Sequence, residues 1–256
     1  MKNSTLITAF MLIYSLTAFC QEPVSTATVE VKKLQIGVNI SPDYCDRILI
    51  NSSGNEDLAS TIELFNDMET GKFSFTSGLN LNYKVNRKFG LETGIQYSNK
   101  GFAFRMDDLF FGDQIDPRYG FVYDSISGPI PSSIKYRYSF HYIDIPIKVF
   151  VTLGEKRLKF VTGIGITTNI LLKATQTYIS EFENGDKERD TRKQPNDPNP
   201  INFSGTASAG VAYNLSNALE MRIEPTFRYG LLKLFDSEIA SHLWNGGLNI
   251  SCYYTL

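Results

Sequence analysis

Hydrophobic and polar residues alternate along most of this chain. The clearest example is residues 157–172, RLKFVTGIGITTNILL, where Ile164 and Ile166 stand on one face and Gly163 and Gly165 on the other. Alternation with a period of two predicts a β-strand with two unlike faces. The segment is long for a strand of a soluble protein and too polar for a membrane-spanning helix. It therefore indicates a strand with one apolar face and one face of small or polar side chains.

Seven other segments show the same alternation of aliphatic or aromatic residues with polar residues or glycine. They cover residues 34–40, 73–85, 89–98, 142–151, 201–215, 219–229 and 242–256. The chain contains 18 Phe and 14 Tyr, and aromatic residues favour strands. Repeated short strands of this kind predict an all-β domain.

The connections between the segments alternate between short and long. The short ones are residues 86–88, 153–156 and 216–217, and the longer ones are 41–72, 101–135, 173–200 and 232–241. Outer-membrane barrels have short periplasmic turns and longer extracellular loops. We therefore predict an all-β fold that is an eight-stranded antiparallel up-and-down transmembrane β-barrel with short periplasmic turns and long extracellular loops.

Charged residues in the middle of the predicted strands indicate which face points inward. A soluble, ligand-binding barrel would turn its apolar face to the interior. Here charged residues of both signs and glycines share the second face, where opposite charges can pair inside a narrow lumen. The apolar face is long enough for the roughly 9–11 residues of a tilted membrane strand. We expect it to contact lipid, with the aromatic residues at its ends forming interfacial girdles.

We interpret the charges of the second face as a structural network inside the lumen. They are Glu92, Asp144, Lys148, Glu220, Arg222, Glu224 and Arg228. Eight strands leave an interior barely wide enough for their own side chains, and an unpaired buried charge is costly. We expect these residues to plug the lumen with salt bridges. An ion or proton path through them is the alternative.

The N-terminus predicts export from the cytoplasm. Lys2 precedes an apolar stretch, and Ala18-Phe19-Cys20 places small residues before Gln21. We expect residues 1–20 to be a signal peptide cleaved before Gln21, residues 21–32 a short periplasmic segment, and residues 33–256 the barrel domain. The expected localisation is the outer membrane.

Few residues are candidates for chemistry. His141 and His242 lie near the predicted outer rim, but neither is part of a recognisable catalytic motif, and His141 has the parity of the lipid-facing residues unless a bulge intervenes. We expect no catalytic residues, no metal site and no cofactor, and hence no enzyme. A small outer-membrane enzyme that uses one of the histidines and a narrow channel are the alternatives. Cys45 and Cys252 are predicted to be unpaired, and a net charge of −2 gives no reason to expect nucleic acid.

The longer loops are the predicted working surface, since loops of this length exceed what strand connection requires. The second and third carry aromatic residues beyond the needs of a solvated loop, namely Phe110, Phe111, Tyr119, Phe121, Tyr123, Tyr178 and Phe182. We expect partners there to be outer-membrane lipid and lipopolysaccharide, or a protein. The acids of these loops lack calcium-binding spacing and are interpreted as solvated.

Two local features complete the prediction. The spacing of Leu58, Ile62, Phe65 and Met68 in the first loop predicts a short amphipathic helix, which we interpret as a loop plug and not as a partner site. Pro146 and Pro225 interrupt predicted strands, where proline removes a hydrogen-bond donor, and we expect a local bulge at each.

Three motifs carry a resemblance to a known family. They are YIDIP at residues 142–146, TGIGI at 162–166 and EMRIEPTFRYGL at 220–231. In this order and spacing they resemble the PorT-like outer-membrane β-barrel proteins of Bacteroidota-type bacteria, over roughly residues 34–256. The resemblance implies a barrel and allows a role as accessory subunit of an outer-membrane secretion machinery. The chain departs from many outer-membrane barrels in closing on Leu256 rather than on an aromatic residue.

Overall fold

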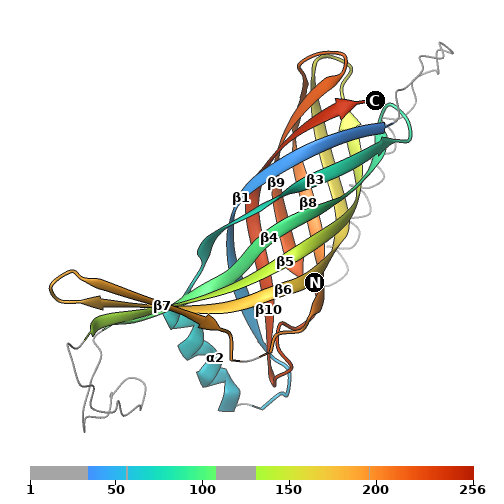
Figure 1. Cartoon of the computed structure of the whole chain (residues 1–256). Helices are drawn as coiled ribbons and strands as arrows, with labels where there is room; N and C mark the ends of the chain where they lie inside the picture. The colour runs from blue at the N-terminus through green and yellow to red at the C-terminus, as the bar shows by residue number, and fades with distance from the viewer. Residues whose placement is uncertain (1–33, 56, 108–130, 196) are drawn as a thin grey trace, which may run out of the picture. The chain divides into compact units, whose positions relative to one another are not determined.

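A computed structural model describes residues 34–55, 57–107, 131–195 and 197–256. The predicted signal peptide and the whole of the predicted periplasmic segment lie outside these residues. In the described part the long strands form a barrel, and one helix lies at one end of it (Figure 1). That helix is not long and apolar enough to span a membrane.

The elements follow the chain as ten strands and one helix within the described residues. They are β1 (Leu34–Asn51), α2 (Asp57–Met68), β2 (Glu69–Thr70), β3 (Lys72–Lys84), β4 (Phe89–Asp107), β5 (Pro131–Leu153), β6 (Leu158–Phe182), β7 (Lys187–Lys193), β8 (Ile201–Asn214), β9 (Leu219–Gly230) and β10 (Ile239–Thr255).

Eight of the strands close a ring of antiparallel neighbours. The order is β1-β3-β4-β5-β6-β8-β9-β10, and β10 pairs with β1 to complete it. β2 and β7 lie outside the ring, where they add to β4 and β6. The predicted eight-stranded up-and-down barrel is confirmed.

The connections divide the barrel into two unlike rims. Residues 85–88, 154–157 and 215–218 form tight turns at one rim, which also holds the start of β1 and the end of β10. We call this the turn rim. The opposite end, with α2 and the extended parts of β4 to β7, is the loop rim.

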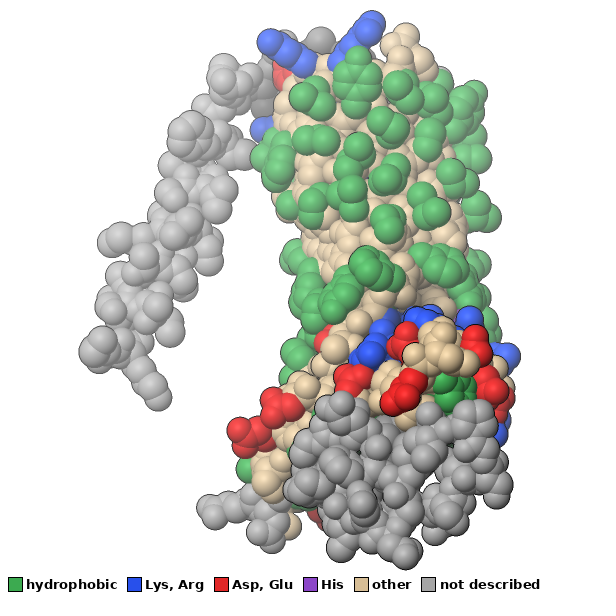
Figure 2. Space-filling model, turned by 90° about the vertical axis from the view of Figure 1, so that its left-hand side faces the viewer, with side chains coloured by type: hydrophobic (Ala, Val, Ile, Leu, Met, Phe, Trp, Pro, Cys, Tyr) green, Lys and Arg blue, Asp and Glu red, His purple; other side chains and the backbone are tan. Residues whose placement is uncertain are grey.

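Side chains in the middle of the barrel follow the predicted faces. On β6, Ile164 and Ile166 are 69% and 56% exposed. Gly165 points inward, where an added Cβ would lie 2.3 Å from the carbonyl oxygen of Ile147. Apolar side chains form a belt around the outer wall (Figure 2). The apolar face therefore points outward, and the soluble-barrel alternative, which needs it inside, is wrong.

Several strands run further than the sequence pattern predicted. β1 continues to Asn51, β4 to Asp107 and β6 to Phe182, so parts of the three expected loops are strands. The predicted loop at 173–200 contains β7 and forms a hairpin with β6. These extensions lie beyond the apolar belt, so their outward residues are not aliphatic. Because the strands were predicted from alternating aliphatic residues, the pattern did not reveal the extensions.

The expected bulges at Pro146 and Pro225 are wrong. The register of β5 against β4 and β6 is the same on both sides of Pro146, and that of β9 is the same on both sides of Pro225. The strands tolerate the missing donor without an inserted residue. The β5–β6 pairing shifts register at two other places: between Pro131 and Ser133, and between His141 and Tyr142, where Leu172 is the extra residue on β6.

Candidate functional site: the lumen and the projecting sheet

Arg222 is at the centre of the lumen and is fully buried. Its Nε donates to Glu220 Oε1 at 2.7 Å, and its Nη1 lies 3.6 Å from Glu92 Oε2. The guanidinium also lies over the rings of Phe150 and Tyr253, 4.5 and 4.6 Å from their centroids. Cation–π contacts and two carboxylates together replace the water that this charge loses.

Lys148 lies between two of the predicted carboxylates, Glu92 and Glu224. Its Nζ lies 3.1 Å from Glu92 Oε1 and 3.4 Å from Glu224 Oε1. Ser208 donates to Glu224, and the Tyr253 hydroxyl donates to Glu92 at 3.0 Å. Every carboxylate of the cluster thus has a cation and at least one further donor within reach.

The central cluster is balanced in charge. Lys84, which the sequence analysis did not single out, lies 3.1 Å from Glu220 and is the third cation beside three glutamates. The space left between Glu92, Lys148 and Arg228 is a cavity of about 20 Å³. A single water needs roughly 10–15 Å³, so this part of the lumen holds no continuous water column.

The seven predicted lumen residues do not form one network. Asp144 pairs with Lys100 at 3.0 Å and accepts from Asn169 at 2.6 Å. Arg228 lies 3.5 Å from Asp43. The other five predicted residues form the central cluster, so the network is divided into three groups stacked along the barrel.

Asp43 and Lys100 are functional-site residues that the sequence analysis missed. Asp43 accepts hydrogen bonds from Ser41, Thr76 and Asn245, each at 3.0 Å or less. Both residues lie just past the predicted ends of their strands: Asp43 falls in the predicted loop 41–72, and Lys100 lies between the predicted strand 89–98 and the predicted loop 101–135. Their inward parity, continued from the strand, is the signal that would have found them.

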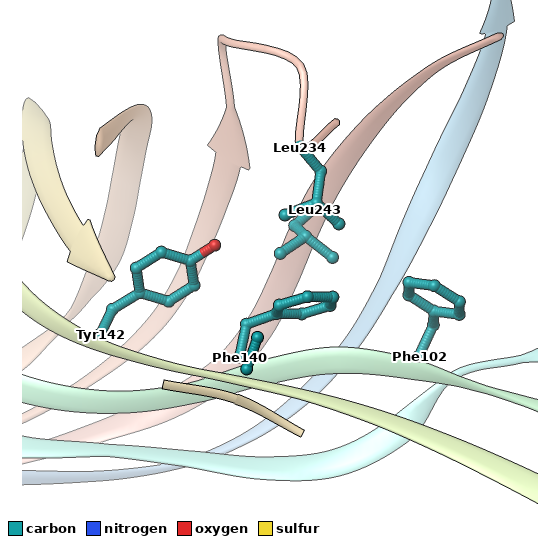
Figure 3. Close-up of a cluster of buried hydrophobic side chains, with 6 residues drawn as sticks. Phe102, Phe140, Tyr142, Leu234 and Leu243 are labelled. Carbon is teal, nitrogen blue, oxygen red and sulfur yellow. The ribbon is translucent and has the colours of Figure 1, made fainter. Parts of the chain in front are cut away.

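An apolar cap closes the lumen at the loop rim (Figure 3). Phe102, Phe140 and Tyr142 point inward from β4 and β5, and Leu234 reaches them from the connection between β9 and β10. Phe140 is 0% exposed and Leu234 is 1% exposed. The lumen is thus filled by paired charges in its middle and by hydrophobic side chains at this end.

The predicted amphipathic helix is present as α2, but it does not enter the lumen. Arg47 of β1 pairs with Glu69 of β2 and stacks 3.9 Å from the centre of the Phe102 ring, which ties the start of β2 to the cap. The apolar side chains of α2 remain only partly buried, apart from Met68. The plugging role expected of the helix falls to the loop that carries Leu234.

Beyond the cap, four strands leave the barrel wall as a small sheet that we call the projecting sheet. It consists of residues 101–107 of β4, 131–139 of β5, 174–182 of β6 and all of β7. The face continuous with the lumen is aromatic. Phe104 packs on Tyr136 and Tyr136 on Tyr178, with centroids 5.8 and 5.1 Å apart. Burial raises the pKa of Tyr138 on this face to about 12.

The two histidines lie on the outer wall, away from the lumen charges. His141 contacts the hydroxyl of Tyr97, and His242 stacks on Tyr229 and contacts the carbonyl oxygen of Gly230 at 3.0 Å. Both therefore sit among the aromatic residues at the edge of the apolar belt. Among the described residues, neither histidine contacts a carboxylate that would orient it as a general base.

Lys72 and Ser139 come closest to a nucleophile and its base. Lys72 Nζ donates to Ser139 Oγ at 2.7 Å and to Asn99 Oδ1 at 2.8 Å. Serine and lysine form catalytic dyads in some hydrolases. Here the two residues are only 8% and 7% exposed, so no substrate reaches the serine in this conformation.

Cysteine and metal chemistry add nothing to this picture. Cys45 and Cys252 are both free, as the sequence predicted. Among the residues that the structure describes, no group of His, Cys, Asp and Glu is arranged to hold a metal ion.

The closed antiparallel ring, the outward apolar belt and the charged lumen are the features of a membrane barrel. A family model, outer membrane protein beta-barrel domain, matches residues 19–236. The chain belongs to this family. Its place is therefore the outer membrane, and its outward belt is the lipid-facing surface. No curated protein matches the sequence significantly.

Solved structures with a similar fold are outer-membrane proteins of low sequence identity. Neisserial surface protein A has 9% identity and a TM-score of 0.43, with 87% of this chain and 97% of that chain covered. OprG of Pseudomonas aeruginosa has 7% identity and a TM-score of 0.41, covering 87% and 96%. The outer-membrane protease OmpT of Escherichia coli has 10% and 0.39, covering 91% and 99%. At such scores these likenesses carry no functional argument.

Proposed function

We propose that this protein is a closed outer-membrane barrel that works by interaction, with the projecting sheet and its neighbouring loops as the working surface. The observation that supports this most strongly is the filled lumen. A central cluster of three carboxylates and three cations, with an apolar cap above it, leaves no route for a solute. Function is then left to the surfaces at the rims.

The loop rim is the better candidate of the two. In barrels with an even number of strands both termini lie on the periplasmic side, so the loop rim faces outward from the cell. The turn rim consists of tight turns, whereas β5 and β6 continue for 23 and 25 residues. A tilted strand needs roughly 9–11 residues to span the membrane. The surplus length builds the projecting sheet.

A conductance measurement tests the closed lumen. We expect the purified full chain in planar bilayers to give no steady current. Replacing Glu92, Lys148 and Glu224 by alanine removes the middle of the plug without changing the outer wall, and should give measurable openings. The matched control replaces three outward residues, Ile147, Ile164 and Ile166, by valine and should stay silent. Stable openings of the unmodified protein would contradict the closed lumen.

Shortening the hairpin tests the working surface. Thr177 and Thr191 pair directly, so residues 178–190 can be replaced by Asn-Gly to form a tight hairpin turn. We expect this variant to fold as a barrel but to lose the complexes that the intact protein forms in solubilised outer membrane. A control with Asn-Gly at 86–87 of the turn rim should keep them. Full retention by the shortened variant would move the interaction elsewhere.

A role as accessory subunit of a secretion machinery is the second candidate. It depends on the resemblance of YIDIP to the PorT-like proteins, and in this structure Asp144 of that motif has an internal task, pairing with Lys100. If the protein is a secretion accessory, pull-down from solubilised outer membrane should recover a stoichiometric complex of other membrane components. Recovery of the barrel alone would leave the free-standing interaction role.

A further inference from the structure

The outer face of the projecting sheet, which continues the lipid-facing wall, is basic. Strand pairing places six Lys and Arg residues on it, namely Arg105, Lys135, Arg137, Lys187, Arg189 and Lys193, and Lys173 continues the same face at the edge of the barrel wall. The acids of the same face are Asp107 and Glu181. The opposite face of β7 carries Glu188, Asp190 and Arg192, so the mixed sequence KERDTRK is sorted by the strand into a basic face and a largely acidic one.

The two acids do not neutralise the basic face evenly. Glu181 pairs with Lys187 at 2.7 Å, and Arg105 lies between Asp107 and Glu181 at 2.8 and 3.7 Å. All of these contacts are at the far end of the sheet. Lys135 and Arg189 lie level with Arg105, whereas Arg137 and Lys173 lie progressively closer to the barrel. No ion pair within the described residues engages any of these four side chains. The uncompensated positive charge of the described residues therefore extends from the middle of the sheet to the membrane-spanning wall.

The sheet bends so that this face turns toward the membrane. Leu172 forms the bulge on β6. Gly101 has a φ of 149°, a conformation that favours glycine, and this allows β4 to bend at the same level. In Figure 1 the β6–β7 hairpin projects sideways from the barrel instead of continuing along its wall. A wall that bends outward turns its outer face toward the belt. Figure 2 shows Lys and Arg side chains directly beyond the end of the hydrophobic belt.

We propose that this basic face binds the phosphate groups of the phosphorylated glycolipid in the outer leaflet, and so holds the projecting sheet against the membrane surface. The proposal rests on the proposed function, since it takes the loop rim to be extracellular. Lys173 lies opposite His141 at the edge of the aromatic girdle, which is the depth of lipid headgroups. Arg and Lys are the side chains that recognise phosphate, arginine through paired N–H donors.

Lipid phosphate accounts for the arrangement better than a soluble partner does. Within the described residues, the unpaired positive charge extends from the middle of the sheet to the belt, whereas Lys187 at the tip of the hairpin, where a soluble partner has the easiest access, is paired with Glu181. The other face of the same hairpin is aromatic and acidic, so the basic face is not the result of a generally basic loop. The whole chain has a net charge of −2, so the excess of positive charge on this face does not reflect a generally basic protein.

Lipid binding by the full chain in detergent micelles tests the proposal. The probes are diphosphorylated lipid A and lipid A stripped of its phosphates, with bound lipid counted by native mass spectrometry. We expect the unmodified protein to prefer the diphosphorylated form, with binding that weakens as the ionic strength rises. The triple variant Lys135→Gln, Lys173→Gln and Arg189→Gln should bind it more weakly by on the order of tenfold to a hundredfold.

A matched triple removes the same charge at the other rim. Arg87→Gln, Lys88→Gln and Lys156→Gln change exposed residues of the tight turns and should leave binding unchanged. At constant ionic strength, inorganic phosphate equimolar with the lipid should not displace it, because the acyl chains of the lipid add apolar contacts that free phosphate lacks. Deletion of Leu172 removes the bulge while each residue beyond it keeps its face, so this variant should fold, straighten the hairpin and lose the preference as well.

Three results would overturn the proposal. Equal binding of the two lipids by the unmodified protein would mean that acyl chains alone are recognised. Unchanged binding by the basic-face triple variant, or an equal loss of binding in the turn-rim triple variant, would show that Lys135, Lys173 and Arg189 are not the lipid-binding residues. Tight binding of soluble polyglutamate together with equal binding of both lipids would assign the face to an acidic protein instead. None of these three results bears on the conductance measurement, which tests the closed lumen separately.

Discussion

The strand β6 passes through two regions that obey opposite rules. Within the barrel its outward side chains are aliphatic, as at Ile164 and Ile166, and the lumen beside it holds paired charges. Past the bulge at Leu172 the polarity inverts, with Lys173 outside and Ala174 buried inside. The neighbouring β5 changes at the same level, from an inward Lys148 to an inward Phe140.

The inversion shows where the surroundings of the wall change from lipid to water. In hydrocarbon an outward charge costs several kcal/mol, so charges are restricted to the lumen and must be paired there. Beyond the membrane the outer face is wetted, and burial of apolar surface again favours the inside. The same ladder of backbone hydrogen bonds serves both regions, which is why one strand can extend through them without a break in pairing.

The largest expected effect is in the lumen. Arg222→Met leaves Glu220 and Glu92 without the guanidinium that pairs them, and should lower the free energy of unfolding by about 3–5 kcal/mol. The double variant with Glu220→Gln should recover a large part of that loss. Urea titration of the barrel folded in vesicles measures both. If the single and double variants are equally destabilised, Arg222 acts through packing and not through charge.

The observed ion pairs decide which second site belongs in this double-mutant cycle. Sequence spacing does not decide it, because Glu220 and Glu224 each lie two residues from Arg222 on the same face. The structure pairs Arg222 with Glu220 and gives Glu224 to Lys148. Arg222→Met with Glu224→Gln should therefore recover less than the double variant with Glu220, which makes it a matched control.

The second effect tests the inversion directly. Ile164→Arg places a charge in the middle of the lipid-facing wall and should cost about 2–4 kcal/mol. Ile179→Arg makes the same change on the same outward face of β6, but beyond the bulge, and should stay within about 0.5 kcal/mol. Both are measured by the same urea titration. Equal costs would mean that the belt extends over the projecting sheet or that neither position contacts lipid.

The fold was predictable because alternation with a period of two is a strong signal when repeated eight times. The projecting sheet was not, since β7 reads as a mixed charged stretch and its pairing with β6 is invisible to composition. The sequence predicted which charged residues point into the lumen, but not which residues they pair with. Parity places Asp144 and Arg228 inside, but tilt of the strands and shear of the barrel decide that they meet Lys100 and Asp43.

The third effect is confined to the projecting sheet. Tyr178→Ala removes one edge-to-face aromatic contact with Tyr136 and the cation–π contact of Arg192, 5.6 Å from the ring centroid. Such contacts contribute about 0.5–1.5 kcal/mol each. We expect faster amide exchange in β7 with no change in the urea midpoint of the barrel. A shift of that midpoint would show that the two regions unfold as one unit.

The smallest effect is a pH dependence at the tip of the hairpin. The hydrogen bond and charge of Lys187 hold the pKa of Glu181 below its ordinary value of 4.5, although the side chain is only partly buried. Because the folded pKa is the lower one, the pair stabilises the tip fully above pH 4.5 and loses this contribution as the pH falls through the folded pKa. The amide of Phe182, which donates to the backbone carbonyl oxygen of Asp186, reports on the tip. Its exchange rate in the unmodified protein should approach that of Glu181→Gln only in acid, whereas Glu188→Gln, on the opposite face of β7, should behave like the unmodified protein throughout.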